Sequence, residues 1–123
     1  MNIKIKAGVI GIGVMGSSYA KMIKTLRDVE LVGIMDVKEN QLTDLAKELN
    51  VDCFTDAGKF FDTAKPEVVV ISCPDEFHAK YVLMALERNI NVHLEKPVAD
   101  TIENCRIILD ASKKSKAKVN IGY

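Results

Sequence analysis

The glycine-rich stretch Val-Ile-Gly-Ile-Gly-Val-Met-Gly at residues 9–16 constrains this chain more than any other feature. An apolar run typical of a strand precedes it, and apolar residues at helical spacing follow it. Gly11, Gly13 and Gly16 therefore form a G-x-G-x-x-G turn between a strand and a helix. In such a turn the first glycine permits the tight bend, the second admits a pyrophosphate group, and the third lets the helix lie close to the strand. The N-terminus of that helix offers free N–H groups and a partial positive charge to the phosphates.

Asp36 supplies the second half of a dinucleotide-binding pattern. It stands twenty residues after Gly16 and directly follows an apolar run that reads as the second strand. A carboxylate at this position accepts hydrogen bonds from the ribose hydroxyls of NAD and repels the 2′-phosphate of NADP. Val37 and Lys38 follow it, in place of the Ser-Arg pair that commonly accommodates this phosphate. The pattern predicts NAD as the cofactor, and Lys38 leaves NADP possible.

The composition is that of one ordinary globular domain. The 123 residues can bury one core but hardly two, with 48% hydrophobic and 28% charged residues. Seventeen basic and seventeen acidic residues argue against a nucleic-acid partner. We expect no membrane span and no secretion signal, because no apolar stretch is long enough and the first residues alternate as a strand does. Cys53, Cys73 and Cys105 are few and widely spaced, which predicts no metal site and favours a reducing, cytoplasmic setting.

Strand-like and helix-like segments alternate along the whole chain. Strands are expected at residues 4–10, 30–35, 53–54, 68–71, 91–94 and 118–121, and helices at 14–26, 39–49, 55–61, 74–88 and 100–115. This alternation predicts an α/β fold, a doubly wound parallel sheet of the Rossmann type with strand order 3-2-1-4-5-6. Ligands of such sheets bind outside the carboxyl ends of the strands. That edge is expected to hold Gly11, Gly13, Asp36, Ser72, Cys73, Glu95, Lys96 and Tyr123.

Several side chains are expected to have structural roles. Asn50 is expected to end its helix in the left-handed conformation, Thr55 or Asp56 to cap the short third helix, and Asp100 with Glu103 to form a capping box. His93 is expected in or near the sheet packing, and Cys73 as a neutral thiol. The residues expected to face the core from the first helix are Tyr19, Met22, Ile23 and Leu26. The methionines expected as core filler are Met15, Met22, Met35 and Met84.

Glu95, Lys96 and Pro97 end the fifth expected strand. On pattern alone, a charged pair at a strand end is usually just a solvated terminus. The position allows a second interpretation. A lysine on this edge, beside a nicotinamide ring, could donate or accept the proton that accompanies hydride transfer.

Further motifs continue the pattern: Val-Val-Val-Ile-Ser-Cys-Pro-Asp, then His78, then Leu-Glu-Lys-Pro. Together with the glycine turn and Asp36, their order and spacing over the whole chain resemble the glucose–fructose oxidoreductase/inositol dehydrogenase family, Gfo/Idh/MocA. The resemblance implies that Lys96 assists proton transfer and that Glu95 lies near the nicotinamide ribose.

The same resemblance implies roles for the loop after the fourth strand. Cys73, Pro74 and Asp75 would line the cofactor, and His78, more often a structural or solvent-facing residue by its position alone, would support the loop. Family members often have Thr-Pro-Asn here, so an amide contact to the cofactor is expected to be altered. Taken together, the residues expected to contact the cofactor are Gly11, Gly13, Val14, Met15, Gly16, Asp36, Val37, Ser72, Cys73, Pro74, His78, Glu95 and Lys96.

The resemblance implies an NAD(P)-dependent oxidoreductase that acts on a sugar, polyol or related hydroxyl or carbonyl compound. Family enzymes continue into a second α/β domain that holds this small-molecule substrate. We therefore expect residues 1–123 to be the dinucleotide-binding domain alone, which binds cofactor without turnover. The alternative is a nucleotide-binding sensor or interaction module without catalysis.

A homo-oligomer is expected from the last strand. Val119, Ile121 and Tyr123 alternate onto one face, and an apolar stripe left uncovered there would invite pairing with a second copy.

Overall fold

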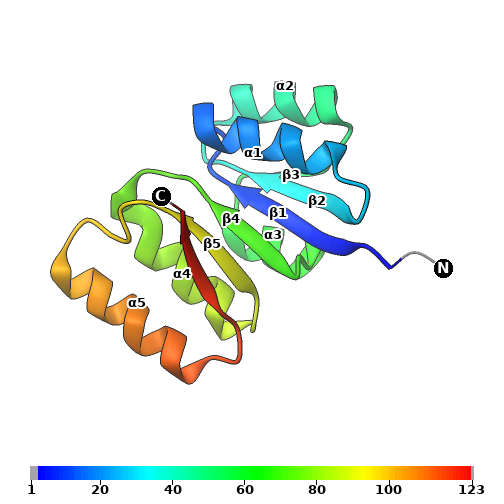
Figure 1. Cartoon of the computed structure of the whole chain (residues 1–123). Coiled ribbons are helices and arrows are strands. Elements are labelled where there is room, and N and C mark those ends of the chain that lie inside the picture. Colours follow the sequence, from blue (N-terminus) through cyan, green and yellow to red (C-terminus); the bar gives the residue numbers. More distant parts are fainter. Residues whose placement is uncertain (1–2, 123) are drawn as a thin grey trace.

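A computed structural model describes residues 3–122 and shows one parallel sheet with helices on both faces (Figure 1). Its strands are β1 (Ile5–Ile10), β2 (Val29–Met35), β3 (Cys53–Phe54), β4 (Val68–Ile71), β5 (Asn91–Glu95) and β6 (Val119–Gly122). Its helices are α1 (Val14–Thr25), α2 (Glu39–Leu49), α3 (Ala57–Ala64), the 3-10 turn η1 (Asp75–Phe77), α4 (His78–Glu87) and α5 (Ile102–Lys114). The strand order β3-β2-β1-β4-β5-β6, parallel throughout, confirms the predicted doubly wound Rossmann sheet.

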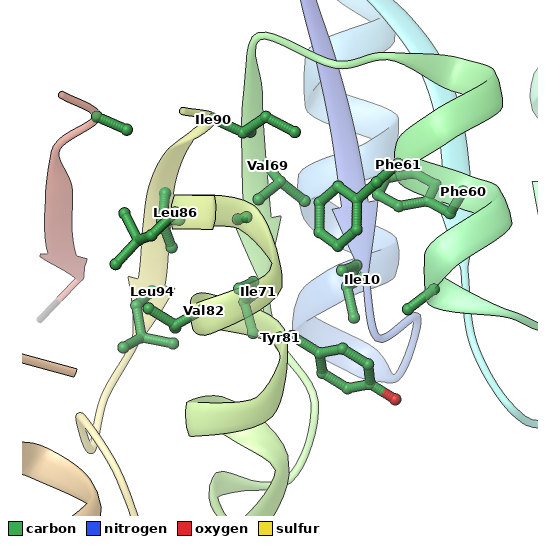
Figure 2. Close-up of a cluster of buried hydrophobic side chains, with 14 of the residues drawn as sticks. Ile10, Phe60, Phe61, Val69, Ile71, Tyr81, Val82, Leu86, Ile90 and Leu94 are labelled. Carbon is green, nitrogen blue, oxygen red and sulfur yellow. The ribbon is translucent and has the colours of Figure 1, made fainter. Parts of the chain in front are cut away.

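The core has two layers, one on each face of the sheet. Ala7 and Val9 of β1 pack with α1 and α2, while Ile10 of the same strand packs with α3 and α4. Successive residues of a strand point to opposite faces, so the central strands must be apolar on both. Figure 2 shows the second layer, in which Phe60 and Phe61 lie against Ile10 and Val69.

Helix ends follow local signals, with one correction. Asn50 ends α2 in the left-handed conformation as expected, and Asp56 caps α3 by accepting a hydrogen bond from the Lys59 amide. The expected capping box at Asp100 is wrong by one residue. Thr101 is the N-cap of α5, and its hydroxyl accepts from the amide N of Asn104 at 3.0 Å. Asp100 lies one residue too early to reach that amide, and its carboxylate accepts from the Asn104 side chain instead.

The buried face of α1 also differs from the expectation. It consists of Gly16, Ala20 and Ile23, while Met22 is 50% exposed and Leu26 is 44% exposed. Gly16 lies against the carbonyl O of Gly11, so the face of α1 that carries Gly16 is turned toward the sheet, and Leu26 lies past the last helical residue, Thr25, with an extended backbone. Met15 is likewise exposed and is not core filler, whereas Met35 is buried.

The last strand does not leave the predicted apolar stripe open. Val119 and Ile121 of β6 pack against the hydrophobic cluster beneath α4 and α5, and Tyr123 lies outside the described residues. The opposite face of β5 and β6 carries polar side chains, among them His93 and Asn120, which pair in register. The exposed apolar stripe on which the homo-oligomer was predicted is therefore covered within the chain, and the homo-oligomer itself stays a prediction.

Phe60 tests the importance of the second core layer. It is fully buried and makes edge-to-face contacts with Phe54 and Phe61, at centroid distances of 5.7 and 5.1 Å. Phe60→Ala removes these contacts and leaves a cavity, so the free energy of unfolding should fall by about 3–5 kcal/mol in urea denaturation. Phe77→Ala is the control, because Phe77 is largely exposed and its loss should cost under about 1 kcal/mol. Equal losses for the two variants would contradict this description of the core.

Candidate functional site

The loops after β1, β2 and β4 begin at the same level of the sheet. The amide of Gly11 donates to the carbonyl of Met35 at 2.8 Å, and the amide of Ser72 donates to the carbonyl of Ile10 at 2.8 Å. Both hydrogen bonds continue the sheet ladder one step past the strand ends. The fold therefore brings the predicted residues of these loops, far apart in sequence, to one carboxyl edge, at which β5 also ends with Glu95.

The glycine turn is shaped by close backbone contacts. Gly11 has a φ of +87°, and a Cβ there would lie 2.6 Å from the backbone N of Cys73. A Cβ on Gly16 would lie only 1.6 Å from the carbonyl O of Gly11, so α1 could not approach the turn. At Gly13 no atom lies within 4 Å of the corresponding position. Gly11 and Gly16 are thus required by the fold itself, whereas Gly13 is not.

Asp36 has a structural role that the sequence pattern did not indicate. Its Oδ2 accepts a hydrogen bond from the amide of Ile12 at 2.9 Å, and its Oδ1 accepts from the amide of Lys38 at 3.0 Å. The carboxylate therefore fastens the glycine turn to the loop after β2. A carboxylate has about four acceptor positions, so two remain for the hydroxyls of a ribose.

Cys73 follows Ser72 in the loop after β4 and is half-buried. Burial raises the pKa of the Cys73 thiol to about 12, and the negative charge of Asp36 adds to the effect. The thiol is therefore neutral at physiological pH, as expected, and is a poor nucleophile.

His78 lies behind the edge rather than on it. The side chain is buried, with its Nε2 2.9 Å from the carbonyl O of Cys73 and its Nδ1 2.9 Å from the carbonyl O of Pro97. The ring thus joins the loop after β4 to the loop that carries Lys96. The side chain, 1% exposed, presents almost no surface to a cofactor, and its role in supporting the loop stays a prediction.

Lys96 and Glu95 have different surroundings at the end of β5. Lys96 is exposed and makes no ion pair within residues 3–122. Glu95 is half-buried, and its Oε1 accepts a hydrogen bond from the hydroxyl of Tyr19 in α1. The sequence patterns single out Glu95 and Lys96 but not Tyr19, which was expected only as a core residue.

Large apolar side chains are exposed in the loops and helix ends at this edge. They are Val14, Met15, Val37 and Phe77. Exposed apolar side chains at the edge where a ligand is expected are typical of a binding surface. Within residues 3–122, no three His, Cys, Asp or Glu side chains lie close enough together to hold a metal ion, and no helix could cross a membrane.

Residues 5–123 match the family model GFO_IDH_MocA, described as an oxidoreductase family with an NAD-binding Rossmann fold. The chain belongs to the Gfo/Idh/MocA oxidoreductase family. It is 30% identical to the inositol 2-dehydrogenase of Salmonella paratyphi B, in an alignment that covers 97% of this chain and 37% of the relative. It is 34% identical to the D-glucoside 3-dehydrogenase of Escherichia coli K12, with coverage of 89% and 32%.

Among solved structures, this Gfo/Idh/MocA domain is similar to the scyllo-inositol dehydrogenase of Lactobacillus casei with bound NAD(H) and scyllo-inositol. The TM-score is 0.91 at 28% identity, covering 97% of this chain and 36% of the other. The chain therefore spans about a third of the length of the relatives that it matches.

Two glycine substitutions separate binding from folding in this family domain. Gly13→Ala adds a methyl group where the fold has space, so the free energy of unfolding should change by less than about 1 kcal/mol. The same methyl group would keep a pyrophosphate from the N-terminus of α1, so calorimetry should show NAD binding weakened by about tenfold or more. Gly16→Ala, in contrast, should destabilise the fold by about 2 kcal/mol or more. Unchanged NAD affinity in Gly13→Ala would refute the assignment of the turn to phosphate binding.

Proposed function

We propose that residues 1–123 form the dinucleotide-binding domain of an NAD-dependent oxidoreductase that acts on a sugar, polyol or related hydroxyl or carbonyl compound. The observation that carries the proposal is the arrangement of the carboxyl edge, where the glycine turn follows β1, the Asp36 carboxylate follows β2 and Lys96 follows β5 of one parallel sheet. The names of the similar proteins, an inositol 2-dehydrogenase and a D-glucoside 3-dehydrogenase, are the basis for the substrate class.

The residues at this edge suit the three parts of the cofactor. The first amides of α1 have no partner within the helix, and its N-cap Gly13 provides no capping side chain, so these amides are available to a pyrophosphate. Asp36 retains acceptor positions for the adenosine ribose, beside the exposed Val37. Glu95 and Lys96 would then face the nicotinamide half.

The chemical step is divided between cofactor and protein. NAD, when bound, supplies the hydride acceptor. Lys96, free of ion pairs in the part of the chain that the structure describes, would hold or accept the proton of the substrate hydroxyl through its Nζ. His78 would keep the loop of Lys96 at a fixed distance from the loop of Cys73.

The free state of all three cysteines supports the cytoplasmic setting that we propose for this protein.

NAD should bind more tightly than NADP. The Asp36 carboxylate, held in place by two backbone amides, would repel a 2′-phosphate. Calorimetric titration with both cofactors at physiological salt should show this preference, and Asp36→Ala should narrow it. Lys38→Ala is the matched control, since loss of a lysine that could attract the phosphate should widen the preference. Tighter binding of NADP to the unaltered chain would refute the prediction.

The isolated chain should bind NAD without reducing it. Lys96 is exposed, so a polyol bound next to it would be surrounded by water. Hydride transfer requires that the reacting carbon of the polyol is held over the nicotinamide ring, and an exposed surface does not hold it there. Mixing the chain with NAD and a panel of polyols and aldoses should change the cofactor fluorescence but leave absorbance at the reduced-cofactor band flat.

Lys96→Met is the control for this experiment, compared at NAD concentrations that give the same change in cofactor fluorescence as in the unaltered chain. Reduction of NAD that disappears in Lys96→Met would show that the chain is catalytic on its own. Absence of NAD binding would remove the proposed function altogether.

A further inference from the structure

Four polar side chains from three elements form one hydrogen-bond network on the α1 side of the sheet. The hydroxyl of Tyr19 in α1 contacts Oε1 of Glu95 and lies 3.2 Å from Nε2 of His93. On the other side of the imidazole ring, Nδ1 of His93 lies 3.1 Å from Nδ2 of Asn120 in β6. The rings of Tyr19 and His93 also meet edge to face, with centroids 5.5 Å apart.

The donors and acceptors of this network define one direction of hydrogen bonding, from Asn120 through His93 and Tyr19 to Glu95. The amide nitrogen of Asn120 can donate but not accept, so Nδ1 of His93 must be the acceptor. The proton of the neutral ring then resides on Nε2, which donates to the oxygen of Tyr19. The Tyr19 hydroxyl in turn donates its own proton to Glu95. Each group that accepts one hydrogen bond donates the next, and the last acceptor is the Glu95 carboxylate.

The donor to Glu95 persists over the whole physiological pH range. The hydrogen bond to Glu95, burial and the negative charge of Glu95 together raise the pKa of Tyr19 to about 12. Tyr19 therefore stays protonated, and the carboxylate keeps its partner.

The network joins two parts of the candidate site. Tyr19 stands in the second turn of α1, the helix whose N-terminus forms the glycine turn, while Glu95 directly precedes Lys96. Gly122 of β6 makes room for the network, because a Cβ there would lie 2.9 Å from Nε2 of His93. Since Tyr19 occupies Oε1, the other carboxylate oxygen of Glu95 remains available to an external hydroxyl.

We propose that Tyr19, aligned by His93 and Asn120, is a positioning residue that orients the Glu95 carboxylate toward the nicotinamide-ribose half of the dinucleotide. The proposal rests on the proposed function, since it assumes that a dinucleotide lies along the carboxyl edge. Loss of the Tyr19 hydroxyl frees the carboxylate to rotate, so binding of the nicotinamide half should weaken while binding of the adenosine half should not.

The test compares NAD with ADP, which lacks the nicotinamide half, on the 123-residue chain. Calorimetry should show that Tyr19→Phe weakens NAD binding by about tenfold, the loss expected for a hydrogen bond to a charged group. ADP affinity should stay within about twofold. Thr25→Val is the matched control: its hydroxyl, in the last turn of the same helix, donates only to the carbonyl of Met22. This variant should leave both affinities unchanged.

The outcomes are distinct. An unchanged ratio of NAD to ADP affinity in Tyr19→Phe overturns the positioning role, and an equal loss for both ligands overturns it in favour of a general structural role. If the unaltered chain binds neither ligand, the proposed function fails, and the positioning role fails with it.

Two further measurements keep the proposal testable if Tyr19→Phe does not fold. Nitrogen NMR of the unaltered chain should place the His93 proton on Nε2, and a proton on Nδ1 overturns the directed network. Glu95→Gln removes the charge next to Tyr19, so carbon NMR of the labelled tyrosine should show the pKa of Tyr19 falling from about 12 toward 10. A Tyr19 that titrates alike in both chains has no contact with Glu95, and the proposal is then overturned.

Discussion

The rest of the structure depends on how closely α1 approaches the end of β1. The Cα of Gly16 lies so near the carbonyl of Gly11 that no side chain fits between them. This contact directs the N-terminus of α1 at the carboxyl edge and turns the face that carries Gly16, Ala20 and Ile23 toward the sheet. It also lets Tyr19, one turn later, reach across the sheet to Glu95. One steric constraint thus shapes the glycine turn at one end of the candidate site, and it also brings Tyr19 close enough to contact Glu95 at the other end.

The loops at the carboxyl edge are fastened to one another as well as to their strands. Asp36 connects the glycine turn to the loop after β2, and His78 connects the loop after β4 to that after β5. Each connection runs from one side chain to backbone groups, so one side chain determines where the partner loop lies. Sites whose supporting contacts are already made bind with less loss of conformational freedom. This arrangement therefore favours a cofactor surface that exists before the cofactor arrives.

The sequence predicted the strand order, the approximate helix positions and, among the described residues, those at the carboxyl edge, because these depend on periodicity, glycines and strand ends. It did not predict which face of α1 is buried, since that face is set by the contact of Gly16 with Gly11, and Leu26 lies past the end of the helix. Thr101 rather than Asp100 caps α5 because the helix begins at Ile102, one residue later than the spacing of Asp100 and Glu103 predicted. His78 contacts Pro97, which is 19 positions away, and Tyr19 contacts Glu95, which is 76 positions away. Single-sequence patterns carry no information on such contacts.

Asp36 shows how selectivity and architecture can share one side chain. The carboxylate that would distinguish two cofactors also holds the turn in which both would place their phosphates. A substitution at Asp36 that exchanges one cofactor for the other, in evolution or in protein engineering, would therefore change the glycine turn as well. Removing the charge also loosens the turn, so a higher ratio of NADP to NAD affinity would come with weaker binding of both cofactors. A neutral acceptor that binds the amide of Ile12 would avoid this loss. Change at this site is therefore expected to require paired substitutions, and single-residue routes should be rare.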